Sequence, residues 1–150
     1  MTEVKISRFR SGLARQLAQP GGCSVQEAVR RADAGVEARR EDAMLEMSAV
    51  VGRLDVLCRD RSVTDEAKVY DLATALVDVA GLLDTGAFYR TAYSLCEVAD
   101  RMTIRGRWDW QSVEVHVSAL RLLLSQGPIS EAVATTLLSN LAAVNDHHRP

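Results

Sequence analysis

The sequence is poor in the residues that build metal centres and disulfide frameworks. Its three cysteines, Cys23, Cys58 and Cys96, lie far apart, form no Cys-x-x-Cys pair and have no histidine at ligand spacing. Structural zinc sites and small disulfide-bonded folds need ligands that are closely spaced. The pattern therefore predicts reduced thiols, no metal and no other cofactor, in a cytosolic setting.

Long hydrophobic runs and a strong net charge are also missing. No segment is apolar over the roughly 20 residues that a membrane-spanning helix requires, and the basic N-terminal stretch lacks the apolar core of a signal peptide. The formal net charge is -2, which gives no overall field to attract nucleic acid. We therefore expect a soluble, cytoplasmic protein that binds neither membranes nor nucleic acid.

Motifs of the common enzyme classes are absent from the sequence. It has no glycine-rich phosphate loop, no GxSxG, no HExxH and no pair of carboxylates in an identifiable cleft. Basic and aromatic residues alternate in RGRWDW (residues 105–110), as they do in proteins that stack on nucleic-acid bases. One such cluster in an acidic chain is more typical of tryptophans that cover the open end of a helical bundle.

Helix breakers are sparse, with three prolines and nine glycines in 150 residues. Every long segment between them repeats apolar residues at steps of three and four, which is the period of an amphipathic helix. The expected helices cover about 25–59, 64–84, 87–104, 110–125 and a last segment after QGPIS (126–130), with caps at Ser24, at Ser62 or Thr64, and at Asp109. Short connections favour antiparallel neighbours, so we predict an all-α, up-down antiparallel helical bundle.

We expect one helical-bundle domain over residues 23–150, preceded by an N-terminal arm over residues 1–22. In the arm, Phe9, Leu13 and Leu17 recur at intervals of four between arginines, the pattern of a short amphipathic helix that packs on its own domain or on a second copy. The segment 37–58 of the first long helix is also amphipathic and could pair with a copy of itself. A structural homodimer is therefore one alternative for this chain.

The second expected helix has two contrasting faces. Its buried stripe is predicted to contain Val69, Leu72, Ala73, Leu76, Ala80 and Leu83. Thr74 points away from this stripe, and Val77, Asp78 and Gly81 extend an outer face of small residues that we expect to be exposed. This face is either a surface that simply lacks long charged side chains, or a flat surface on which another protein docks.

The segment LATALVDVAGLLD (72–84), followed by AFYRTAYSLCEVAD (87–100), resembles the central helical hairpin of histidine phosphotransfer (HPt) domains. The family pattern is His-x-Leu-Lys-Gly-x-Ala-Gly-x-Leu-Gly. The framework residues that match this pattern or its flank are Ala73, Leu76, Ala80, Gly81 and Leu83. The resemblance implies a four-helix core whose outer hairpin face meets receiver domains.

The residues that would carry phosphate differ from the family pattern. Thr74 stands at the phosphoacceptor histidine, Val77 at the lysine that steadies the phosphoryl group, and Asp78 at a glycine. A neutral imidazole can attack an aspartyl phosphate, whereas a threonine hydroxyl needs a base beside it. Asp78 adds negative charge where the family has none. The resemblance is therefore to a degenerate HPt domain that docks without relaying phosphate.

The whole chain is also similar to small CheE-type proteins of alphaproteobacterial chemotaxis operons, through RFR (8–10), PGGCSVQEAVRRAD (20–33), AYSLCEVADR (92–101) and GRWDWQSVEVHVSALRLL (106–123). This similarity implies chemotaxis or two-component signalling. The implied partners are a CheY-like response-regulator receiver domain or a histidine kinase. We expect the partner to bind Thr74, Val77, Asp78 and Gly81, flanked by Tyr89 and Tyr93 of the next helix.

The remaining histidines offer one enzymatic alternative. His116 lies at the border of an apolar stripe, which is typical of a half-buried core histidine. A phosphotransferase that uses His116, with Arg121 as phosphate partner, would instead require a solvent-facing ring. His147 and His148 lie in a polar tail that we expect to fray.

Overall fold

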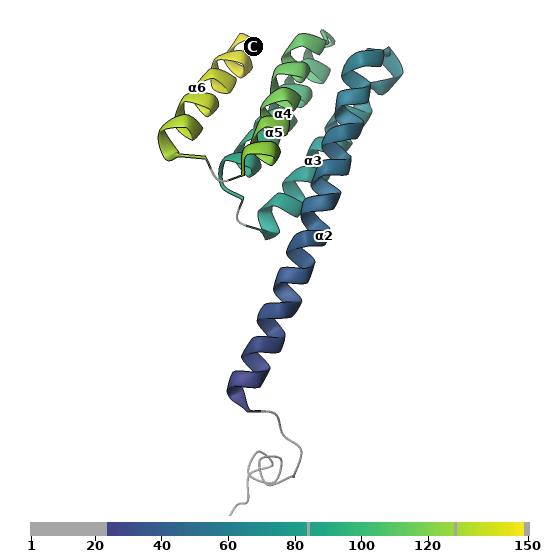
Figure 1. Ribbon diagram of the computed structural model, residues 1–150. Helices are drawn as coiled ribbons and strands as arrows, with labels where there is room; N and C mark the ends of the chain where they lie inside the picture. Colours follow the sequence, from purple (N-terminus) through teal and green to yellow (C-terminus); the bar gives the residue numbers. More distant parts are fainter. Residues whose placement is uncertain (1–23, 84, 128, 149–150) are drawn as a thin grey trace, which may run out of the picture. The chain divides into compact units, whose positions relative to one another are not determined.

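The computed structural model describes residues 24–83, 85–127 and 129–148, and these contain helices and no β-strand. The elements are α2 (Val25–Asp60), a short 3-10 helix η1 (Val63–Asp65), α3 (Glu66–Leu82), α4 (Ala87–Arg105), α5 (Trp110–Gln126) and α6 (Glu131–His147) (Figure 1). The predicted all-α helical bundle is confirmed. None of the described helices is long and apolar enough to cross a membrane.

Contacts divide the chain into two units, residues 1–38 and 39–150. In the first unit, the described residues 24–38 belong to α2 and its cap. The second unit contains the bundle. The predicted arm (1–22), with its apolar residues Phe9, Leu13 and Leu17, lies outside the described residues, as does Cys23.

The predicted helix caps are present on α2 and α5 but not on α3. The side chains of Ser24 and Asp109 accept hydrogen bonds from backbone N–H groups in the first turns of α2 and α5, and Ser130 does the same for α6. Ser62 and Thr64 were expected to cap α3, but their hydroxyls bind each other at 2.9 Å. Because η1 intervenes, Asp65 takes the cap position of α3 without a side-chain cap bond.

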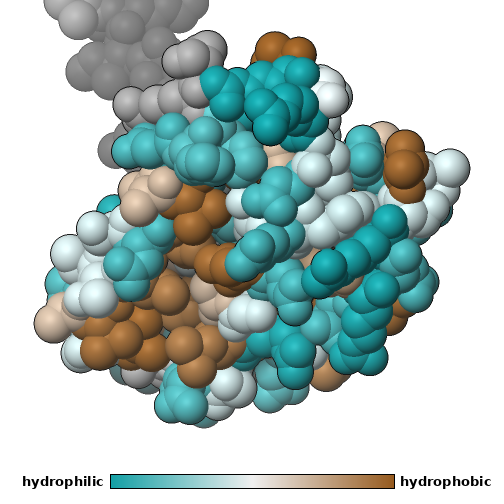
Figure 2. Space-filling view, turned by 90° about the horizontal axis from the view of Figure 1, so that it is seen from above, coloured by the Kyte–Doolittle hydropathy of each residue, from teal (hydrophilic) through white to brown (hydrophobic). Residues whose placement is uncertain are grey.

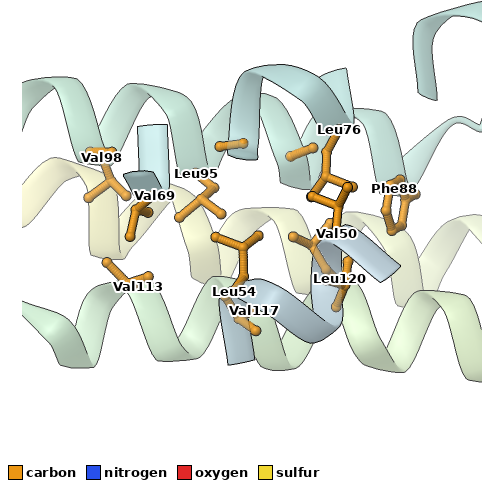
Figure 3. Close-up of a cluster of buried hydrophobic side chains, with 14 of the residues drawn as sticks. Val50, Leu54, Val69, Leu76, Phe88, Leu95, Val98, Val113, Val117 and Leu120 are labelled. Atoms are coloured by element: carbon orange, nitrogen blue, oxygen red, sulfur yellow. The ribbon is translucent and has the colours of Figure 1, made fainter. Parts of the chain in front are cut away.

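The hydrophobic core is formed by four helices, and its apolar side chains point toward one another (Figure 3). On α3 the buried residues are Val69, Ala73, Leu76 and Ala80, all 0 % exposed, which confirms that part of the predicted stripe. Phe88, Leu95 and Ala99 of α4 are also buried. Leu72 and Leu83 were also expected in the core but are half-buried, because they lie at the edge of the cluster and pack against it from outside.

From α3 to α6, each helix packs against the next one in the chain, and one further contact joins α4 to α6. α3 packs against α4 and α4 against α5, while α6 lies against both α4 and α5. Figure 1 shows α6 beside these two helices. The C-terminal ends of α4 and α5 are followed by glycines with positive φ, Gly106 (61°) and Gly127 (66°), in a backbone conformation that other residues rarely adopt.

Replacing Leu76 by alanine should test the register of α3. Leu76 is 0 % exposed, so we expect Leu76→Ala to lower the free energy of unfolding by about 2–5 kcal/mol. Leu82 lies on the same helix and is 86 % exposed, so Leu82→Ala should cost less than about 0.5 kcal/mol. Urea unfolding of both variants measures the difference. Equal losses would show that the buried face of α3 is assigned wrongly.

Candidate functional site

The residues singled out on the α3–α4 hairpin gather on its outer side. We call this set the hairpin face; it contains Thr74, Val77, Asp78, Gly81, Tyr89 and Tyr93. Asp78, Gly81 and both tyrosines are exposed. Thr74 and Val77, which were expected to be exposed, are half-buried. The hairpin face is therefore exposed to solvent at Asp78, Gly81 and the two tyrosines, and partly buried at Thr74 and Val77.

The half-burial of Thr74 has a local cause. Its hydroxyl donates to the carbonyl of Tyr70 at 3.0 Å, and its oxygen lies 3.9 Å from the sulfur of Cys96 on α4. Burial raises the pKa of the Cys96 thiol, so Cys96 is protonated at neutral pH and supplies no basic thiolate to Thr74. A hydroxyl whose proton already binds a backbone carbonyl, with no base in contact, is a poor nucleophile.

Val77 and Asp78 contribute an apolar side chain and a negative charge to the hairpin face. Val77 packs against the hydrophobic core from its edge, which explains why it is not exposed as predicted. Asp78 is exposed as predicted, and the exposed Asp71 lies on the same helix. These positions place an apolar contact and negative charge around Thr74, where phosphoryl transfer would need positive charge.

Gly81 and the two tyrosines lie next to one another on the hairpin face. A Cβ atom built on Gly81 would lie 3.4 Å from Cε2 of Tyr89, so the ring of Tyr89 rests against the glycine. Tyr89 stacks on Tyr93 with ring centroids 6.4 Å apart and planes inclined by 24°. The face thus offers two exposed aromatic rings, which combine apolar area with a polar tip.

A groove of about 290 Å³ runs beside these tyrosines, between α4 and α6. Its lining residues include Tyr89, Arg90, Tyr93, Ser94, Leu138 and Asn145. The sequence did not indicate this groove, because α4 and α6 are not consecutive helices and the hydrophobic period does not say which helices pair. In the view from above, hydrophobic side chains gather in a patch at the lower left, and hydrophilic side chains predominate on the right (Figure 2).

His116 is fully buried, not at the border of the core as expected. It is 0 % exposed, its Nδ1 lies 2.8 Å from the carbonyl oxygen of Ser112, and its Nε2 lies 3.0 Å from the hydroxyl of Ser94. Burial lowers the pKa of His116. The solvent-facing ring that the phosphotransferase alternative requires is therefore not present in this structure. Arg121, its proposed phosphate partner, pairs with Asp55.

His148, like His116, is more buried than the sequence predicted. The polar tail was expected to fray, but His148 is 8 % exposed and its Nε2 lies 2.9 Å from the hydroxyl of Ser112. His147 is exposed. No group of three or more histidine, cysteine, aspartate or glutamate side chains in the described part of the chain is placed to hold a metal ion.

The tryptophans of RGRWDW cover the end of the bundle, as the sequence suggested. Trp108 and Trp110 are half-buried, pack against the core, and meet edge to face at 5.6 Å. Arg105 and Arg107 remain exposed. The rings are therefore committed to packing and are not displayed as a stacking platform for bases.

Comparison of the chain with protein-family models, with curated proteins and with solved structures gives no match.

Proposed function

We propose that this protein is a non-catalytic, HPt-like adaptor of bacterial chemotaxis or two-component signalling. In this proposal the hairpin face docks a CheY-like receiver domain, or a histidine kinase, in the cytoplasm without relaying phosphate. The observation that carries the proposal is the position of Thr74. Thr74, which the sequence resemblance aligns with the family's histidine, is half-buried on α3, and its hydroxyl is bound to the backbone carbonyl of Tyr70.

Support for docking comes from the open part of the face. Gly81 adds no side chain to the surface, and Tyr89 and Tyr93 present stacked, exposed rings next to it. Tyrosines of this kind often anchor protein interfaces, because they bury a large area and lose little side-chain entropy. A partner that binds here would contact the exposed Gly81 together with the ring of Tyr89 that lies against it.

Support for docking without transfer comes from the chemistry around Thr74. Phosphotransfer through a hairpin of this type needs a nucleophilic ring and a nearby cation. Thr74 offers a hydroxyl, Val77 an apolar side chain and Asp78 a carboxylate. The cytoplasmic setting is also part of the proposal, and the free thiols of Cys58 and Cys96 are consistent with a reducing compartment.

The alternative of phosphotransfer through His116 has less support. Both ring nitrogens of His116 lie within hydrogen-bond distance of protein oxygens, and the ring is buried. A phosphoryl group could reach Nε2 only after Ser94 had moved away. This route would need a rearranged protein, whereas docking on the hairpin face uses the structure as it is.

A structural homodimer is the second candidate, and α2 supplies the observation in its favour. Val25, Val29 and Val36 of this helix are 80 %, 52 % and 66 % exposed, and they fall on one side of it. Pairing of two such stripes would bury them. Light scattering on purified protein decides this point: a dimer that Val29→Glu converts to monomer would support it, and a monomeric parent would exclude it.

Docking on the hairpin face should be sensitive to bulk at Gly81. We expect Gly81→Arg to weaken binding of a CheY-like receiver domain about tenfold or more, about 1.4 kcal/mol, because the side chain intrudes into the contact. Calorimetry measures the dissociation constant. Gly52→Arg is the matched control, since Gly52 is an exposed helical glycine on α2 with open space around the position that a Cβ would take.

The two arginine variants separate the possible outcomes. Circular dichroism should show both folded, because neither glycine is in the core. Equal binding by the parent and Gly81→Arg would place the docking surface elsewhere and reduce the HPt resemblance to a likeness of fold. Equal weakening by Gly81→Arg and Gly52→Arg would point to a general effect of added charge.

The absence of phosphate transfer can be tested separately. When the protein is incubated with a phosphorylated histidine kinase or receiver domain, we expect it to remain unlabelled, because Thr74 has no base beside it. Autoradiography after gel electrophoresis measures the label. The triple variant Thr74→His, Val77→Lys and Asp78→Gly restores the family residues and serves as the positive control. Acid-labile label on the parent chain that disappears in His116→Gln would instead establish the His116 route.

A further inference from the structure

The helix α6 carries more apolar surface than the bundle covers. Over its range Glu131–His147, the only fully buried apolar side chains are Ala134 and Leu141, and neither belongs to the main core cluster. Residues 132–145 contain no charged side chain, so the uncovered sides of α6 are apolar or neutral. A helix that meets water on its outer sides normally carries charged residues there. The composition of α6 is therefore that of a helix that is covered on more than one side.

The two flanks of α6 face different neighbours. Leu138 and Ala142 line the groove beside the tyrosines of α4. Val133, Leu137 and Val144 lie on the other flank of the helix. Because α6 packs against both α4 and α5, this second flank lies on the side of α5. Val133 is 52 % exposed, while Leu137 and Val144 are half-buried, so a row of apolar side chains borders α5 on its outer side.

A second apolar row, on α5, lies next to this flank. Val115 and Leu122 are 42 % and 46 % exposed, and the exposed Ser118 lies between them. Ser112, three residues before Val115, bonds His148 at the end of α6, so Val115 lies near the side of α5 that meets α6. Because the start of α5 meets the end of α6, the two rows run side by side. We call them together the α5–α6 face; it contains Val115, Ser118, Leu122, Val133, Leu137 and Val144.

The α5–α6 face carries no charge. The charged residues of α5, Glu114 and Arg121, pair with Arg61 and Asp55 on the side of α2. Between two copies related by a twofold axis, the same patch meets itself, so a charged residue near the axis would face its own copy. A neutral face avoids this repulsion. It also offers a charged partner no counter-charge, which makes the charges of such a partner costly to bury.

A lipid surface matches α6 less well. Helices that lie in a membrane interface combine an apolar face with lysines and arginines beside it. The helix α6 has no lysine or arginine, and its ionisable side chains are Glu131, Asp146 and His147. A protein surface of the same neutral kind is therefore the better match.

The spacing of the row on α6 suits a helix-to-helix contact. Val133, Leu137, Asn140 and Val144 follow steps of four, three and four residues. These are the steps at which residues face a partner helix in a coiled coil. A second helix can therefore lie along the whole row.

The size of the α5–α6 face is that of a small dimer contact. Both helices have 17 residues. Two such helices side by side, each about 25 Å long and about 10 Å wide, cover a footprint of about 500 Å². Specific interfaces bury about 800 Å² of accessible surface per partner, and the accessible surface of side chains exceeds their footprint. A contact of this size predicts reversible pairing.

We propose that a second copy of the chain covers the α5–α6 face, so that α5 and α6 of one copy pack on α5 and α6 of the other about a twofold axis. This surface is distinct from the exposed valines of α2. The hairpin face stays uncovered, because it lies beyond the opposite flank of α6, which Leu138 and Ala142 form. The pairing does not depend on receiver docking; that a dimer presents two docking faces rests on the proposed function.

Sedimentation velocity of the purified protein tests the pairing. Over a concentration series from about 1 to about 300 μM, we expect the average mass to rise from that of one chain toward that of two, because interfaces of this size are often weak. A parent that remains monomeric over the whole series would overturn the proposal, whatever else the face then binds.

Matched substitutions identify the surface. The double variant Leu122→Glu and Val133→Glu places two carboxylates in the α5–α6 face, and we expect at least tenfold weaker self-association because the buried charges have no partner. The control is Val29→Glu with Val36→Glu, at valines of α2 that are 52 % and 66 % exposed. We expect the control to dimerise like the parent. Equal or greater weakening by the control would overturn the proposal.

NMR of the parent at rising concentration tests the same surface without any substitution, so the test survives if the double variant fails to fold. The backbone amide signals of the α5–α6 face should shift as the protein is concentrated, with those of Asp78 and Gly81 on α3 unchanged. Shifts confined to α2 or to the hairpin face would overturn the proposal.

Discussion

The close packing of α3 against α4 is the constraint on which the rest of the structure depends. Fully buried alanines occur on both helices, Ala73 and Ala80 on α3 and Ala92 and Ala99 on α4. Small side chains at a helix contact let the backbones approach closely and fix the rotation of each helix. Once this contact is set, Asp78 and Gly81 must face outward beside Tyr89 and Tyr93. The candidate site is thus a consequence of how the core is packed.

If the protein is the HPt-like adaptor that we propose, the same packing accounts for a docking shape without transfer chemistry. The hairpin is held together by buried alanines and leucines, and this packing does not require a particular residue at position 74. An adaptor needs only the outer surface, whereas a relay needs a nucleophile and a cation on it. Thr74 and Val77 are partly buried, and Thr74 is hydrogen-bonded to Tyr70 while Val77 contacts the core. In the proposed function this arrangement suits a surface that binds a partner without reacting with it.

The sequence predicted the helices, most of their caps and the buried residues of α3, because these depend on local period and on side chains three or four residues apart. It did not predict that Thr74 and Val77 are half-buried, since the helical period separates inside from outside but does not show how far a neighbouring helix covers the border. It also missed the burial of His116 and His148. His116 bonds Ser94 on α4, and His148 bonds Ser112 on α5. In addition, α6 packs directly against α4, although α5 lies between them in the sequence. Non-consecutive contacts of this kind leave no periodic signal in one sequence.

The most direct measurement of the central claim, that the hairpin face is a docking surface, is a titration of the nitrogen-15-labelled protein with a CheY-like receiver domain, followed by NMR. We expect the amide signals of Asp78, Gly81, Tyr89 and Tyr93 to shift or broaden first, with the buried backbone of α5 around Val117 and Leu120 unaffected. The phosphorylated and unphosphorylated receiver should perturb the same residues, because no phosphoryl group is exchanged. Perturbation confined to α2 or to the end of the bundle near Trp108, with the hairpin face silent at saturation, would contradict the claim.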